Sequence, residues 1–159
     1  MTKMDFVAEP GRQEVIITQV FDAPRELVFK MYTDPSRIPQ WWGPRNLTTV
    51  VDRMELKPGG IWRFVQRDAE GNVFAFHGIF HLVVPPERII QTFEFEGMPG
   101  HVLLETMTFE DLDGRTKMTQ QSVYQAVSDR DGMVSMGMMQ GNAESMERLS
   151  ELLVKGAGK

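Results

Sequence analysis

The chain has 159 residues, of which 42% are hydrophobic and 25% are charged, the composition of an ordinary globular domain. Its net charge of −5 argues against a nucleic-acid-binding surface and against attraction to an anionic membrane. The absence of cysteine excludes disulfides, thiol nucleophiles and cysteine metal ligands. No apolar run has the length of a membrane span or the character of a signal peptide, so we expect a cytoplasmic protein.

The order of the predicted elements indicates the fold class. Residues 1–12 are expected to form a lead-in and residues 13–155 a single domain. Glu14 to Phe21 is rich in β-branched residues and predicts the first strand. Two short helices follow, the first beginning near Pro24 and the second ending before Pro44. Six more strands are predicted, at 47–56, 61–67, 73–84, 88–95, 101–110 and 115–125. Short turns and segregated helices indicate an α+β fold with an antiparallel sheet.

Residues 128–155 predict one long amphipathic helix, with Ser128 expected to cap its first turn. Apolar residues recur every three or four positions and predict one buried face: Met133, Met136, Met139, Ala143, Met146, Leu149 and Leu153. Methionine is flexible and can repack around variable contents, and the glycines in this segment permit close backbone approach. The helix is therefore interpreted either as the cover of a cavity or as a core helix with methionine as filler.

Alternation along the strands predicts which side chains face inward. Among the inward apolar positions lie several polar residues, and burying such groups without partners costs about 1–3 kcal/mol each. They must therefore either bond to one another or line a pocket with a few convergent polar groups. We predict a ligand-binding site formed by Trp62, Phe64, Phe76, Glu105, Met107, Gln120, Ser122, Tyr124, Met136, Met139 and Gln140.

The sequence gives little indication of catalysis, and we expect no cofactor and no metal. His77 and His81 lie four positions apart on one predicted strand, roughly 13 Å, which is too far for one ion. No nucleotide-binding glycine motif and no nucleophile-elbow motif is present. If chemistry occurs, Glu105 is the candidate general base, with Tyr124 or Gln120 as hydrogen-bond donors.

Several motifs, taken in order, resemble those of the activator of heat-shock protein 90 ATPase-like family within the START-like, or SRPBCC, superfamily. They are Phe21-Asp22-Ala23-Pro24, Thr33-Asp34-Pro35, Trp41-Trp42-Gly43-Pro44, Lys57-Pro58-Gly59-Gly60-Ile61-Trp62-Arg63-Phe64 and Pro85-Pro86-Glu87-Arg88-Ile89, with Gly141, Met146, Leu149 and Leu153 in the terminal helix. The resemblance runs from about Gln13 to Leu153. It implies a helix-grip fold, in which a curved antiparallel sheet of about seven strands surrounds a long C-terminal helix, with a cavity between them.

The superfamily includes lipid and hormone carriers, polyketide cyclases and chaperone activators, and the fold alone does not choose among them. We predict a binder of a small hydrophobic molecule. The alternatives are a chaperone-interacting module and a cyclase-like enzyme with Glu105 as general base. Trp41 and Trp42 either gate the mouth of the pocket or anchor the short helices to the sheet. No nucleic-acid or membrane partner is expected. A homodimer is expected only because homodimers are common among proteins in general.

Overall fold

The computed structural model describes residues 4–157, which form one antiparallel sheet of eight strands and three α-helices. The strands are β1 (Asp5–Val7), β2 (Glu14–Phe21), β3 (Thr48–Met54), β4 (Ile61–Arg67), β5 (Val73–Val84), β6 (Arg88–Phe95), β7 (Val102–Asp111) and β8 (Thr116–Val123). The helices are α1 (Arg25–Thr33), α2 (Val127–Ser135) and α3 (Met138–Ala157), and a short 3₁₀ helix, η1 (Ile38–Gln40), follows α1. Across the sheet the strands lie in the order β1-β2-β8-β7-β6-β5-β4-β3.

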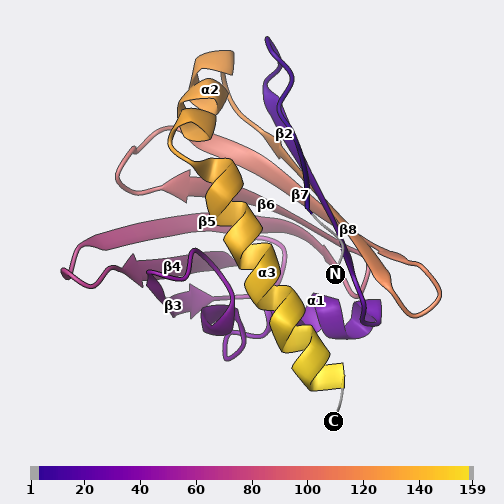
Figure 1. Ribbon diagram of the computed structural model, residues 1–159. Helices are drawn as coiled ribbons and strands as arrows, with labels where there is room; N and C mark the ends of the chain where they lie inside the picture. Colours follow the sequence, from indigo (N-terminus) through magenta and orange to yellow (C-terminus); the bar gives the residue numbers. More distant parts are fainter. Residues whose placement is uncertain (1–3, 158–159) are drawn as a thin grey trace.

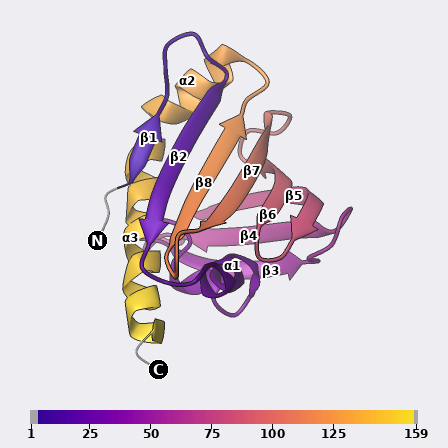
Figure 2. The same cartoon turned by 90° about the vertical axis from the view of Figure 1, so that its right-hand side faces the viewer.

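The sheet curves around α3, which crosses one of its faces (Figure 1 and Figure 2). The two ends of α3 differ in their neighbours: α2 lies beyond its N-terminal end, and α1 lies near its C-terminal end (Figure 1). This arrangement confirms the predicted helix-grip fold and the two short helices after the first long strand. Within residues 4–157, no helix is both long enough and apolar enough to cross a bilayer.

The sheet contains one strand more than was predicted. Residues 5–7, expected to belong to an unstructured lead-in, form β1 and pair with residues 16–18 of β2. Phe6 packs against the cluster that contains Val15 and Ile17, which gives this short segment a reason to order. Three residues are too few to show the period of a strand, so the sequence pattern missed it.

The terminal helix is two helices, so the prediction of one long helix was wrong. Gly137 adopts a φ of 90° between α2 and α3, a conformation that glycine reaches without steric cost and that commonly ends a helix. The break changes the direction of the apolar stripe. Met136 and Met139 are 67% and 54% exposed, and their predicted burial was also wrong. The capping role predicted for Ser128 is not found either, because α2 begins after Ala126 without a side-chain cap.

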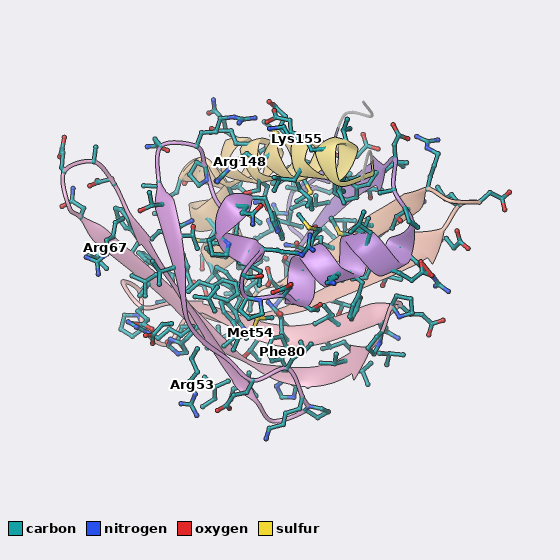
Figure 3. All side chains as sticks on the ribbon, turned by 90° about the horizontal axis from the view of Figure 1, so that it is seen from below. Arg53, Met54, Arg67, Phe80, Arg148 and Lys155 are labelled. Carbon is teal, nitrogen blue, oxygen red and sulfur yellow. The ribbon has the colours of Figure 1, made fainter. Side chains whose placement is uncertain are left out.

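Helix α3 keeps the second half of the predicted stripe. Met146, Leu149 and Leu153 are buried against the sheet, as predicted. On its flank, Arg148 donates hydrogen bonds to the carbonyl oxygens of Gly43 (2.8 Å) and Gln40 (3.0 Å). Figure 3 shows Arg148 on α3 and the side chains that fill the layer between this helix and the sheet. The loop after η1 is thus tied to α3 and fixes the helix across the sheet.

Trp41 and Trp42 both pack as anchors. Trp41 is buried, and its indole N–H donates to the Met31 carbonyl oxygen at 3.0 Å. Trp42 packs edge-on against Phe64 and Phe76, with ring centroids 5.0 and 5.4 Å apart. The two tryptophans therefore connect η1 to α1 and to the aromatic face of β4 and β5.

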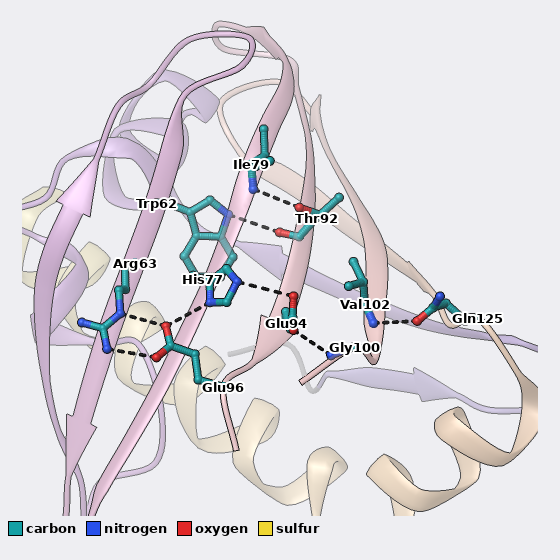
Figure 4. A network of polar contacts seen from close by, with 10 residues as sticks. All are labelled: Trp62, Arg63, His77, Ile79, Thr92, Glu94, Glu96, Gly100, Val102 and Gln125. Atoms are coloured by element: carbon teal, nitrogen blue, oxygen red, sulfur yellow. Dashed lines mark hydrogen bonds and ion pairs between the residues drawn. The ribbon is translucent and has the colours of Figure 1, made fainter. Parts of the chain in front are cut away.

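Trp62 crosses the neighbouring strand to reach a third one. It stands opposite Gly78 of β5, and its indole N–H donates to the Thr92 carbonyl oxygen of β6 at 3.2 Å (Figure 4). A Cβ atom at Gly78 would collide first with the Thr92 carbonyl oxygen and would lie 2.6 Å from the indole nitrogen, so it would fall within the hydrogen bond itself. The missing side chain at Gly78 is what lets one buried tryptophan connect three strands.

We expect Gly78→Ala to lower the free energy of unfolding by about 1–3 kcal/mol, because the added methyl group overpacks both the Thr92 carbonyl and the Trp62 indole that it bonds. Gly132→Ala is the matched control, since a Cβ there meets nothing within 4 Å and alanine favours the helix by up to about 1 kcal/mol. Urea unfolding of both variants measures the difference. Equal stability of the two variants would contradict this account of Trp62.

Candidate functional site

A row of polar side chains crosses three strands on the face covered by the helices. Register places Gln91 of β6 opposite Glu105 of β7, and Glu105 opposite Ser122 of β8. The amide of Gln91 donates to one Glu105 oxygen at 3.1 Å, and the amide of Gln120 donates to the other at 3.2 Å. Gln120 also donates to the Ser122 hydroxyl at 3.4 Å. We call Gln91, Glu105, Gln120 and Ser122 the polar row.

Glu105 and Ser122 of the polar row are buried, Gln91 and Gln120 are half-buried, and the row itself contains no positively charged side chain. Glu105 is 8% exposed and Ser122 is fully buried. Burial raises the pKa of the Glu105 carboxyl to about 7, and the hydrogen bonds from Gln91 and Ser122 only partly oppose this shift. The group can therefore gain or lose a proton close to neutral pH, which an ordinary surface glutamate does not do.

Two tyrosine hydroxyls lie in the electrostatic field of Glu105. Burial, followed by the negative charge of Glu105, raises the pKa of both Tyr32 and Tyr124. The Tyr32 hydroxyl is directed to the sulfur of Met146 at 3.9 Å, and the Tyr124 hydroxyl to the sulfur of Met138 at 3.3 Å. Thioether sulfur is a weak acceptor, so both phenols have hydrogen-bonding capacity to offer a ligand.

A small hollow lies over the next row of the same strands. Phe93 pairs with Leu103, and Tyr124 directly follows Val123, the partner of Leu104. These three side chains line a cavity of about 30 Å³, which at roughly 15 Å³ each holds about two water molecules. Each lies two residues along its strand from a member of the polar row, about 7 Å away. An apolar hollow thus lies about 7 Å along the strands from the buried carboxylate, which does not itself line it.

The rim of the hollow is formed by the β6–β7 turn and by α2. Phe95, Met98, His101 and Val102 contribute from the turn and the adjoining strand ends, and Asp129 and Met133 from α2. The turn is held by two backbone N–H donors: Gly100 donates to Glu94 at 2.9 Å and Val102 donates to Gln125 at 2.8 Å (Figure 4). Glu94 in turn contacts His77, which also contacts Glu96 on the outer face of the sheet (Figure 4).

Helix α2 is tied down at two points and is separate from α3. The His101 ring contacts the Asp129 carboxylate at 3.0 Å, which joins the β6–β7 turn to α2. Arg130, only 3% exposed, donates to the carbonyl oxygens of Glu9 (2.7 Å) and Glu14 (3.1 Å). Gly137, with a φ of 90°, separates α2 from α3. The helix that roofs the hollow therefore has its own attachments, separate from those of α3.

The structure divides the predicted ligand-binding residues into three groups. Glu105, Gln120, Ser122 and Tyr124 come together as expected from strand alternation, and Tyr124 lines the hollow. Met107, Trp62, Phe64 and Phe76 belong to the same hydrophobic core but do not line the hollow. Met136, Met139 and Gln140 are exposed around the α2–α3 break and lie away from the hollow. The hollow lies beneath α2, whereas the predicted site relied on residues of the helix further along.

Sequence reasoning missed several residues of the site. Gln91 could have been found, because Ile89, Gln91 and Phe93 alternate on one face of β6 like the inward residues of β7. Tyr32 had no such signal, since helix α1 reaches the site only through tertiary packing. Met133 was predicted on the buried helical face but was not assigned to the site, because a separate helix α2 was not predicted.

A second, wider groove does not form a comparable site. It is lined by Arg25, Leu82, Val84, Glu87, Arg88, Thr108, Phe109, Glu110 and Asp111. Its two arginines are outnumbered by three carboxylates, and Arg25 lies 3.8 Å from Glu87. Its charged groups do not converge on one point as the polar row does. Among residues 4–157, no group of three or more His, Asp or Glu side chains is placed to hold a metal ion.

The comparisons with known proteins agree with this fold. The sequence profile described as "Activator of Hsp90 ATPase homolog 1-like protein" matches residues 22–154, and the chain belongs to this family. The structure resembles that of a Rhodobacter sphaeroides protein, with a TM-score of 0.89, 22% identity and coverage of 97% and 99% of the two chains. It also resembles an Arthrobacter aurescens protein, with a TM-score of 0.88, 24% identity and coverage of 95% and 91%.

A third similar structure is the AHSA1 protein from Silicibacter pomeroyi, with a TM-score of 0.73, 21% identity and coverage of 90% of this chain and 99% of that one. A search among curated proteins finds no significant match. With sequence identities below 25%, these structural similarities show the shared fold alone. Membership of the family supports a ligand-binding or chaperone-associated module in general terms.

The raised pKa of Glu105 predicts a pH dependence of stability. A carboxyl with a higher pKa in the folded than in the unfolded protein stabilises the fold at low pH. That contribution is lost as the pH rises from about 4.5 to about 7, and it amounts to about 3 kcal/mol. We expect Glu105→Gln to remove this component, as measured by urea unfolding across that pH range at constant ionic strength.

Glu110→Gln is the matched control, because Glu110 lies on the same strand but is exposed. This variant should keep the wild-type loss of stability between the two pH values. An unchanged pH profile in Glu105→Gln would show that Glu105 titrates like a surface carboxylate.

Proposed function

We propose that the protein binds a small, mainly apolar molecule in the hollow beneath α2, with its polar end directed to the polar row. The observation that carries this proposal is the adjacency of an apolar hollow to a buried carboxylate with neutral hydrogen-bonding neighbours. Ligand sites in proteins are mostly apolar, with a few convergent polar groups that orient the ligand.

The present hollow of about 30 Å³ is smaller than any such ligand, so binding requires the roof to move. Helix α2 is suited to this movement because Gly137 separates it from α3. The side chains of Met98 and Met133 are flexible and can repack around molecules of different shape. Binding is then expected to loosen the His101–Asp129 contact while α3 stays fixed by Arg148.

Ethylbenzene and phenethyl alcohol are suitable first probes, and we expect each to raise the thermal unfolding midpoint of the wild-type protein by several degrees. A ligand that binds only the folded state stabilises it by mass action, and each kcal/mol corresponds to about 2–4 °C in a chain of this size. Met133→Trp should abolish the shift, because a larger side chain on α2 fills the hollow.

Met136→Trp is the matched control, because Met136 lies three residues further along but is exposed and does not line the hollow. It should respond to the probes like the wild type. The proposal fails if neither probe shifts the wild-type midpoint, or if both tryptophan variants respond equally.

Family membership supports a second function, association with a chaperone ATPase. We expect the purified protein to increase the ATP hydrolysis rate of the Hsp90-type chaperone of its own host. Coupled ATPase assays at increasing protein concentration measure this effect, and a rate that stays constant would contradict it.

A further inference from the structure

Glu105 is a buried carboxylate whose contacts are all neutral. Its hydrogen-bonding partners are the amides of Gln91 and Gln120 and the hydroxyl of Ser122. Across the part of the chain that the structure describes, no Lys, Arg or His side chain forms an ion pair with it. A buried charge without a counter-charge is costly, and removal of that cost favours a partner that brings a positive charge.

Building on the proposed function, we infer that the ligand is a hydrophobic amine. It binds as the ammonium ion, with its nitrogen at Glu105 and its apolar body in the hollow beneath α2. The inference names the class of ligand for the site described above, and it rests on that site being a ligand site.

The lining of the hollow suits the aromatic body of such an amine. Phe93, Phe95 and Tyr124 line it, and aromatic side chains pack favourably against an aromatic ring. Met98 and Met133 add flexible, polarisable thioethers that can adapt to the ring. Asp129 contributes a carboxylate at the rim, where it contacts His101. The hollow therefore takes the apolar body, while the charged nitrogen lies beyond it at Glu105.

The spacing of the two rows sets the shape of the amine. The polar row and the row of Phe93, Leu103 and Tyr124 lie two residues apart along each strand, about 7 Å. A short chain of a few atoms between an aromatic ring and a nitrogen spans that distance. The nearby hydroxyls of Tyr32 and Tyr124 are directed to methionine sulfurs, so neither occupies a Glu105 oxygen.

Binding of an ammonium ion requires the ionised form of Glu105. Where Glu105 is protonated in the free protein, its proton passes to solvent as the ligand binds, and no covalent bond in the ligand changes. The other titratable or charged groups around this position are Tyr32 on α1, Tyr124 after β8, and Asp129, Arg130 and His101 near the roof. Amine binding should therefore tighten as the pH rises toward neutrality, whereas binding of a neutral analogue should not.

The test compares phenethylamine, phenethyl alcohol and ethylbenzene, which share one ring and differ in the polar end. Titration calorimetry of the full chain measures the three affinities. We expect the amine to bind about tenfold or more tightly than the alcohol, the scale of a hydrogen bond to a charged group. At about pH 6 the heat of amine binding should also vary with the ionisation enthalpy of the buffer, which reports proton release without any substitution.

Glu105→Gln should remove the preference for the amine and keep the affinity for ethylbenzene, whereas Glu110→Gln should keep both. Asp129→Asn tests the rival carboxylate and should retain the ratio of amine to alcohol affinity. The inference is overturned if all three probes bind the wild type with similar affinity, or if Asp129→Asn rather than Glu105→Gln removes the preference. Absence of binding by all three probes, ethylbenzene included, would overturn the proposed function itself.

Discussion

The antiparallel register of β6, β7 and β8 is the constraint on which the site depends. It aligns Gln91, Glu105 and Ser122 across three strands. A shift of one residue in any pairing would turn the Glu105 side chain to the solvent face, because side chains alternate along a strand. The register in turn is held by apolar residues on both sides of the polar row, such as Ile89 and Phe93 on β6. The position of one carboxylate is thus determined by the packing of the whole central sheet.

The aromatic side chains of Trp62, Phe64 and Phe93 form a cluster, which we call the aromatic cluster, and it supports the sheet on the side of β4 and β5. Trp62 reaches over Gly78 to the β6 backbone, and its ring lies 4.8 Å from Phe64 and 5.7 Å from Phe93. Phe93 belongs both to this cluster and to the floor of the hollow. The cluster therefore supports the hollow from one side, while the loop after η1, tied to α3 by Arg148, supports the layer beside it.

The two terminal helices are held to the rest of the structure by different contacts. Helix α3 buries Leu149 and Leu153 and is tied to the η1 loop by Arg148. Helix α2 is short, and only its Arg130 is fully buried. Gly137, with a φ of 90°, lets these two helices take different directions.

The sequence by itself determined the α+β class, the order of the elements from β2 to β8 and the inward faces of β4, β7 and β8. These features follow from local periodicity and turn residues, which act over a few positions. It also brought Glu105, Gln120, Ser122 and Tyr124 into one group, because alternation puts them on the same face. Only the tertiary structure decided that Gln91 completes the row, that β1 joins the sheet and that α2 roofs the hollow. Those features depend on the pairing of distant strands and on the positive φ of Gly137, neither of which a repeating pattern of side chains encodes.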